Sequence, residues 1–225
     1  MFFLKAIQIN PIYAEAYNNL GYVYFINGKI NAAIENYNNS IRFNPMLTMA
    51  YFNRGWAWAV SKEFNNAAND FSFVLKLDSL NELARNNRAY AWFSLSNFSK
   101  AFQDFKANTE YFPKSALAWQ NLGWYYMQLK DYQNAITCFE KSLNLNKTLI
   151  NSYLNLSFIY INKNEFSKAE EILKTALKLN NTNADTYYIY YLLYRKMGKR
   201  ELAKNFLKKS AEFGNAKAID EIKNN

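Results

Sequence analysis

Apolar residues recur along the chain at helical spacing, and the pattern restarts at a fixed interval. In residues 116–149, Trp119, Leu122 and Tyr126 fall on one helical face. A short turn at Lys130-Asp131 follows. The next segment carries a second apolar stripe, made of Tyr132, Ala135, Ile136, Phe139 and Leu143. Neither amphipathic helix can bury its stripe alone, so the pattern predicts helix pairs that stack on one another.

The interval is 34 residues and shows no insertion or deletion. Alanine recurs at it without exception, as Ala33, Ala67, Ala101, Ala135, Ala169 and Ala203. The three prolines, Pro11, Pro45 and Pro113, keep the same phase. The period predicts six units, 14–47, 48–81, 82–115, 116–149, 150–183 and 184–217. Residues 1–13 match the second helix of a partial preceding unit, and residues 218–225 end a C-terminal capping helix.

These positions resemble the tetratricopeptide repeat, and the resemblance covers nearly the whole chain. The eighth position is small in most units, with Gly21, Gly55, Ala89, Gly123, Ser157 and Tyr191. The eleventh is aromatic in all six, with Tyr24, Trp58, Trp92, Tyr126, Tyr160 and Tyr194. The resemblance implies an all-α fold, a right-handed α-solenoid of antiparallel helix pairs forming one domain. It also implies that the protein is a non-enzymatic scaffold for protein–protein interaction.

Three features depart from that pattern or lie at its ends. Arg54 and Arg88 occupy the seventh position, where the family usually has Leu, and we expect their stems to cover apolar surface while their heads reach solvent. In the capping helix, we expect Ala218, Ile219 and Ile222 to face inward, and Lys217, Asp220, Glu221 and Lys223 to face outward. At the other end, Phe2 and Phe3 favour either a chain that extends upstream or self-association through this half-repeat.

Composition narrows the function. The 225 residues carry a net charge of +9, contain no His, and contain one Cys, Cys138. Catalysis by His, Cys–His nucleophiles and His/Cys metal sites are therefore excluded, and we expect no enzymatic activity, metal or cofactor. No apolar run approaches the ~18 residues of a membrane span, and the start lacks signal-peptide features, which favours a cytoplasmic location.

Positive charge concentrates near the C-terminus. Seven basic residues, Arg195, Lys196, Lys199, Arg200, Lys204, Lys208 and Lys209, stand against one acid, Glu201. Such a patch suits a nucleic acid or an anionic membrane surface, and equally suits a solvated terminal face. No basic run continues across the repeats, which weakens the nucleic-acid interpretation.

In the family, the first helices of the repeats line a concave groove. The residues at the sixth position of the repeats are Asn19, Asn53, Asn87, Asn121 and Asn155. Those at the ninth position are Tyr22, Trp56, Tyr90, Trp124 and Phe158. A carboxamide both donates and accepts hydrogen bonds, which suits an extended peptide backbone, and aromatic rings suit apolar side chains. The sequence predicts a peptide-binding groove. Because Asn is common throughout the chain, a purely structural ladder stays an alternative.

Chaperone-binding members of the family clamp a C-terminal carboxylate between Asn and several cations. The corresponding residues are Asn18 and Tyr22, then Asn53, then Leu83 and Asn87, so every cation is missing. The sequence therefore does not predict a chaperone-tail clamp. The open alternatives to a peptide scaffold are a solenoid that binds nucleic acid through its basic end and a self-assembly module.

Overall fold

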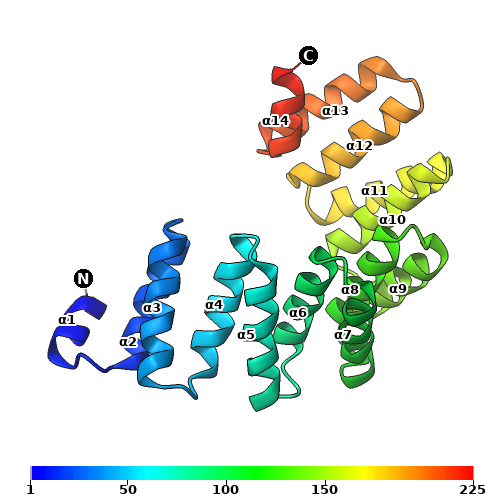
Figure 1. Cartoon of the computed structure of the whole chain (residues 1–225). Coiled ribbons are helices and arrows are strands. Elements are labelled where there is room, and N and C mark those ends of the chain that lie inside the picture. The colour runs from blue at the N-terminus through cyan, green and yellow to red at the C-terminus, as the bar shows by residue number, and fades with distance from the viewer. Residues whose placement is uncertain (1, 225) are drawn as a thin grey trace. The chain divides into compact units, whose positions relative to one another are not determined.

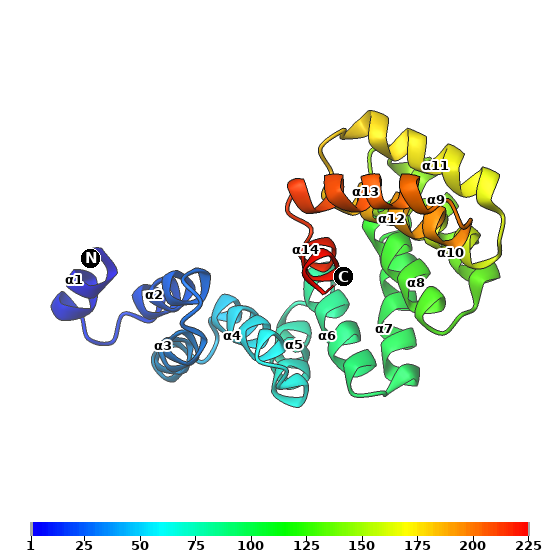
Figure 2. The ribbon, with the colours of Figure 1, turned by 90° about the horizontal axis from the view of Figure 1, so that it is seen from above.

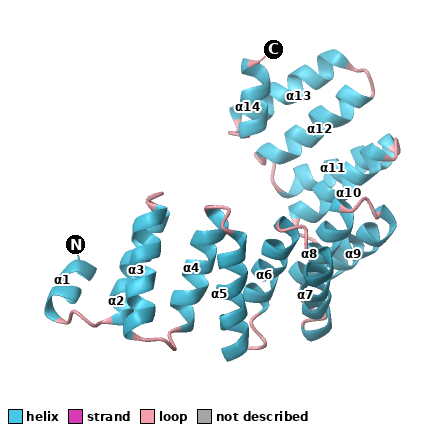
Figure 3. Ribbon diagram, viewed as in Figure 1, coloured by secondary structure: helices cyan, strands magenta, loops and turns pink. Residues whose placement is uncertain are grey.

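The computed structural model describes residues 2–224; Met1 and Asn225, the outermost residues of the partial repeat and the capping helix, lie outside the described residues. Within residues 2–224 the chain forms fourteen helices and no strands (Figure 3). The all-α class predicted from the apolar spacing is confirmed.

The helices follow the 34-residue interval. The first helices of the six repeats are α2 (Ala14–Ile26), α4 (Thr48–Val60), α6 (Glu82–Ser94), α8 (Ala116–Gln128), α10 (Ile150–Asn162) and α12 (Ala184–Lys196). The second helices are α3 (Ile30–Phe43), α5 (Phe64–Leu77), α7 (Phe98–Tyr111), α9 (Tyr132–Leu145), α11 (Phe166–Leu179) and α13 (Arg200–Glu212). Short helices lie at both ends, α1 (Phe2–Ile9) and α14 (Ala216–Lys223).

The chain divides into two compact units, an N-terminal unit that ends at Phe112 and a C-terminal unit that begins at Pro113. In the N-terminal unit, each helix from α2 to α7 packs on the next one, and α2 and α3 are seen nearly end-on in Figure 2. The C-terminal unit stacks α8 to α14 in the same way (Figure 1). In each unit the first helices of successive repeats also touch.

Four of the six helix pairs close on a large ring from the second helix. Tyr37, Phe71, Phe105 and Phe139 are almost completely buried at equivalent positions. The glycine opposite the ring permits this approach, because a Cβ on Gly123 would lie 2.9 Å from the Phe139 ring. The small eighth residue thus lets the two helices of this repeat approach closely.

The turn inside each repeat has a left-handed residue at its fifteenth position. Gly28 and Gly198 occupy it in the outer repeats, and Lys62, Ser96, Lys130 and Asn164 in the inner four, with φ between 60° and 74°. The next N–H reaches back across the helix end, as in the 2.9 Å bond from Asp131 N–H to the Tyr126 carbonyl. This pattern is a Schellman cap, which Gly favours because it lacks a Cβ.

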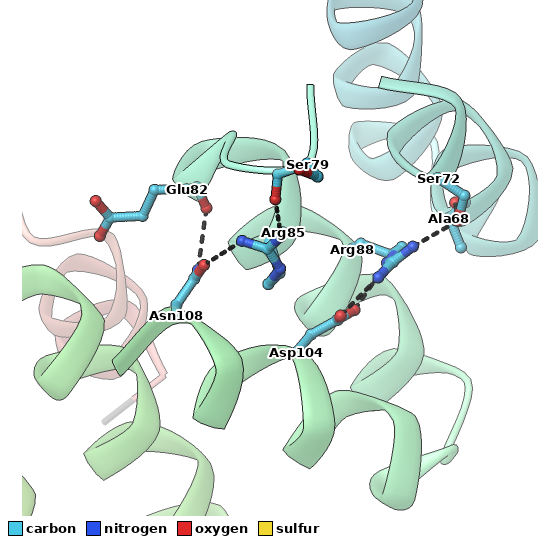
Figure 4. A network of polar contacts seen from close by, with 8 residues as sticks. All are labelled: Ala68, Ser72, Ser79, Glu82, Arg85, Arg88, Asp104 and Asn108. Atoms are coloured by element: carbon cyan, nitrogen blue, oxygen red, sulfur yellow. Dashed lines mark hydrogen bonds and ion pairs between the residues drawn. The ribbon is translucent and has the colours of Figure 1, made fainter. Parts of the chain in front are cut away.

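The fourth residue of a first helix ties that helix to the preceding loop. Tyr17, Trp119, Tyr153 and Tyr187 each donate a hydrogen bond to the carbonyl six residues earlier. Arg85 replaces the aromatic residue in repeat 3 and donates to the equivalent carbonyl, that of Ser79 (Figure 4). It also donates to Asn108 Oδ1 at 3.0 Å. Arg85 therefore makes the same hydrogen bond to the preceding loop as the aromatic residues at this position.

Arg54 and Arg88 keep 20% and 24% of their side chains exposed, but their guanidinium groups are bound by acids. The Arg88 guanidinium binds both carboxylate oxygens of Asp104, at 2.8 and 2.7 Å (Figure 4), and Arg54 binds Asp70 with the same geometry. Both carboxylates are buried. The expected access to solvent is therefore kept only in part, because α5 and α7 each place an acid beside the arginine.

Each arginine also reaches the preceding repeat. Arg88 donates to Ser72 Oγ at 3.2 Å, and Arg54 donates to Asn38 Oδ1 at 2.7 Å. Ser72 in turn donates to the Ala68 carbonyl of its own helix, as Figure 4 shows. The two arginines therefore join neighbouring repeats within the N-terminal unit through polar bonds as well as apolar packing.

Candidate functional site

The side chains predicted to bind a peptide project from the first helices. Asn19, Asn53 and Asn87 lie on α2, α4 and α6 of the N-terminal unit, where adjacent first helices are in contact. Asn19 is exposed, and the other two are half-buried. The equivalent positions therefore lie on neighbouring helices, and their side chains are only partly withdrawn from solvent.

Two of these carboxamides take part in a chain of amide bonds between helices. Asn53 Nδ2 donates to Asn18 Oδ1 at 2.9 Å, and Asn18 Nδ2 donates to Asn19 Oδ1 at 3.3 Å. Asn87 Nδ2 instead donates to the Leu83 carbonyl of its own helix at 2.9 Å. The carbonyl oxygens of Asn53 and Asn87 have no hydrogen-bond partner in the described part of the chain. Each asparagine therefore has its amide held while its acceptor stays available.

At the fifth position of the first helices, the sequence drew attention to Asn18 only as part of a chaperone-tail clamp. Asn18 and Asn86 both occupy it and are both buried, and Asn86 Oδ1 has no hydrogen-bond partner among residues 2–224. The two residues are two repeat lengths apart in the sequence, and this shared position could have identified them as members of the same surface. Through Asn18, this position supplies the acceptor that holds Asn53 in place.

In the C-terminal unit, Asn121 and Asn155 occupy the same position on α8 and α10, and both are half-buried. The first helices α8, α10 and α12 are in contact there. Ser152 on α10 donates to Gln120 Oε1 on α8 at 3.1 Å, which links these two helices as Asn53 links α4 to α2. Polar bonds between first helices are thus present in both units.

The aromatic side chains of the ninth position differ in exposure. Tyr22 and Trp56 are 46% and 44% exposed, and the Trp56 ring packs 5.1 Å from the Phe25 ring of the preceding repeat. Tyr90 is half-buried with its ring edge-on to Phe105, and burial raises the pKa of its hydroxyl to about 12. Trp124 and Phe158 are half-buried as well. The N-terminal end of the row therefore offers the most accessible aromatic surface.

The seven basic residues near the C-terminus do not form one surface of free charge. Lys196 Nζ donates to the Ile161 carbonyl at 2.9 Å near the end of α10, and Arg195 pairs with Glu221 at 2.9 Å. Lys199 and Lys209 lie over tyrosine rings. Arg200, Lys204 and Lys208 have no acidic partner in the described residues. Four of the seven thus have structural contacts, and three are available to a ligand.

The capping helix is rotated relative to the sequence prediction. Ala218 is fully buried as expected, whereas Ile222 is 42% exposed. Glu221, which was expected to face outward, accepts hydrogen bonds from Tyr188, Tyr191 and Arg195. That expectation was wrong, because the two tyrosine hydroxyls and the guanidinium on α12 attract the carboxylate inward. Tyr191 stands at the position that is Gly in three other repeats, so its phenol ring is a feature peculiar to repeat 6.

Chemistry at the single cysteine is disfavoured by its surroundings. Cys138 is buried, and desolvation, with a smaller effect of Asp131, raises the pKa of its thiol to about 11. Only the thiolate is a good nucleophile, so this side chain packs rather than reacts. Among residues 2–224, no three His, Cys, Asp or Glu side chains gather as metal ligands. No helix in that range is both long and apolar enough to span a bilayer.

Family models match four parts of the chain. Models described as tetratricopeptide repeat match residues 2–35, 116–149 and 150–183, and one described as TPR repeat matches residues 22–57. No curated protein gives a significant match in sequence.

Solved structures with this fold are numerous. The chain superposes on a structure of the APC/C hetero-tetramer Cut9–Hcn1 with a TM-score of 0.77 at 20% identity, over 98% of this chain and 44% of that one. PilF from Pseudomonas aeruginosa gives 0.70 at 20% identity, over 93% and 96% of the two chains. YrrB, described as a TPR protein with an unusual peptide-binding site, gives 0.58 at 18% identity, over 82% and 95%. At these identities the likeness concerns the fold, and the chain spans less than half of the first of these proteins.

Proposed function

Since the chain belongs to the tetratricopeptide repeat family, we propose that it is a non-enzymatic protein-interaction scaffold that binds an extended peptide along its first helices. A protein or peptide partner is what this family suggests, and YrrB is one structure of this fold described as having a peptide-binding site. Neither the family nor the likeness to YrrB identifies the partner of this chain.

The observation that carries the proposal is the pair of available acceptors on α4 and α6. Asn53 and Asn87 stand one repeat apart on adjacent helices, and each has its amide N–H held by a bond. A side chain held in this way loses little rotational freedom when it binds a ligand, which lowers the entropic cost of recognition. Two such oxygens can accept hydrogen bonds from the N–H groups of one extended peptide without contacting its side chains.

The aromatic residues next to them supply selectivity. Trp56 lies three residues after Asn53, nearly one helical turn away, and 44% of its surface is exposed. An indole ring buries a large apolar area and has a polar edge, as is common at protein interfaces. Peptides with apolar or Pro-containing segments should therefore be preferred over uniformly charged ones.

The lack of enzymatic activity is part of the same proposal. The sequence has no His, and the only thiol is buried with a raised pKa. The buried acids Asp70 and Asp104 are each held by an arginine, so neither is a free general acid or base. These features support a surface that binds and does not turn over its partner.

The test uses peptides selected from a displayed random library against the complete wild-type chain. The double variant Asn53→Ala with Asn87→Ala removes both acceptors. A neutral hydrogen bond contributes about 0.5–1.5 kcal/mol net, so the pair should weaken binding by roughly 5- to 150-fold in a fluorescence titration. Trp56→Ala should weaken binding further and narrow the set of accepted peptides.

A matched control changes two asparagines away from this surface. Asn65 and Asn69 are exposed on α5, so Asn65→Ala with Asn69→Ala should leave affinity unchanged. Circular dichroism should show the same helix content in all variants. If the Asn53/Asn87 variant remains folded and binds each selected peptide like wild type, the carboxamides serve only to hold the helices, and the proposed groove is wrong.

A further inference from the structure

A pocket of about 580 Å³ lies in the C-terminal unit among α12, α13 and α14. Its apolar lining comes from Ala203, Leu207 and Ile222, and its cationic lining includes Arg200, Lys204 and Lys208. A volume of this size is typical of ligand sites in proteins. The pocket combines apolar surface with positive charge, and it contains none of the residues of the proposed peptide groove.

The pocket is bounded on one side by the capping helix. α14 packs on α13 and is tied to α12 by hydrogen bonds from Asn215 to Asp185 and from Tyr191 to Glu221. Within the described residues, Arg200, Lys204 and Lys208 stay exposed on α13 beside the pocket.

Charge on this exposed surface is unbalanced. Arg200, Lys204 and Lys208 are spaced by four residues along α13, so neighbours in the row lie about one turn apart. Like charges at this spacing repel and destabilise an isolated helix slightly. None of the three has an acidic partner in the described residues, and Glu221, which contacts the lining residue Tyr191, is paired with Arg195. The positive charge and the spacing of this row therefore match a row of acidic side chains on a facing helix.

We propose that this pocket binds an acidic amphipathic helix of a protein partner, which lies on α13 beside α14. In repeats 4 and 5 the first helix of the next repeat packs on the second helix, and α14 packs on α13 in the same way, so a further helix is the shape that fits beside it. The partner's apolar side chains fill the space over Ala203, Leu207 and Ile222, and its Asp or Glu side chains pair with the cations. A nucleic acid has the charge but lacks aliphatic side chains for the apolar lining, and a flat membrane surface does not enter a hollow.

The experiment measures binding of a synthetic helical peptide to the full chain by fluorescence anisotropy at about 150 mM salt. The probe carries Leu at positions i, i+3, i+4 and i+7 and Glu on both flanks of that stripe. We expect Lys204→Glu with Lys208→Glu to weaken binding at least about 10-fold. The same variant should gain affinity for a second probe in which every Glu is replaced by Lys. Ile222→Ser should weaken binding of both probes, since it removes apolar lining and leaves the charge unchanged.

The control reverses two lysines elsewhere in the C-terminal unit. Lys141 and Lys178 are exposed on α9 and α11, so Lys141→Glu with Lys178→Glu makes the same change in net charge. Affinity within about twofold of wild type supports a local site. The proposal is overturned if both double variants lose affinity equally, or if neither does. It is also overturned if single-stranded DNA or phosphatidylserine vesicles bind more tightly than the acidic probe and lose binding in the Lys204/Lys208 variant.

Discussion

At the scale of single residues, buried charge is the least expected feature of the chain. Burial raises the pKa of the Asp70 carboxyl even though Arg54 binds it and lowers it. Desolvation thus exceeds the attraction of the arginine, as is common for buried ion pairs, which often stabilise no more than an apolar pair of the same size. The same two positions in repeat 5 are Leu156 and Ile172, which pack without charge.

Removal of only one residue of the Arg54–Asp70 ion pair should destabilise the protein. Arg54→Leu leaves the Asp70 carboxylate buried without its cation, and we expect the free energy of unfolding to fall by about 3–5 kcal/mol. The double variant Arg54→Leu with Asp70→Ile reproduces the pair of repeat 5 and should recover most of that loss. Urea denaturation of the three proteins measures both differences. Equal loss in the single and double variants would mean that the pair holds the repeats together by its charge.

At the scale of helices and turns, the repeats share a cap that only two of them build with glycine. Lys62, Ser96, Lys130 and Asn164 adopt the left-handed conformation in which a Cβ is unfavourable. The bond from the following N–H to the carbonyl five residues back is nevertheless formed in these turns. The stacked helices therefore impose the turn on residues that do not favour it.

Glycine at one of these turns should stabilise the protein. Lys130→Gly removes the unfavourable Cβ, partly offset by the greater freedom of glycine in the unfolded chain, so we expect about 0.5–1 kcal/mol of added stability in urea denaturation. Lys130→Ala removes the same charge and keeps a Cβ, and its stability should stay within about 0.5 kcal/mol of wild type. Equal gains from Gly and Ala would trace the effect to the lysine charge.

At the scale of the whole molecule, the first helix stands out because none of its described residues is buried. Phe2 is 78% exposed and Ile9 is 85% exposed, and Ile12 in the following loop is 65% exposed. Within residues 2–224, α1 packs on α2. Apolar side chains gathered in this way favour association with another surface.

We therefore expect this chain to self-associate through α1. Light scattering over a concentration series should show a rising apparent mass for wild type, and Phe2→Ser with Ile9→Ser should reduce the rise. Met46→Ser with Leu80→Ser is the control, because these side chains are 63% and 58% exposed in loops between repeats. A wild-type mass that stays that of a monomer, or a control that reduces the rise equally, contradicts the prediction.

The 34-residue period was sufficient to predict the helices. Once Ala33 and its equivalents and the paired apolar stripes are in phase, each segment can bury its apolar side only in a stacked helix pair. Close approach of the pair at Gly123 followed from the same phase, since a small residue opposite a large ring is a local requirement. The row of asparagines could also be placed on the first helices, because helical spacing determines which side chains share a face.

Only the tertiary structure decided which side chains contact each other when their residues are far apart in the sequence. Arg54 meets Asp70, and Asn53 meets Asn18, because neighbouring helices come together at a rotation that the sequence pattern specifies only to within a residue or so. Glu221 faces α12 in place of Ile222 for the same reason, since a small rotation of a short helix exchanges adjacent side chains. The pocket on α13 was likewise decided by the tertiary structure, because its lining comes from three helices, α12, α13 and α14.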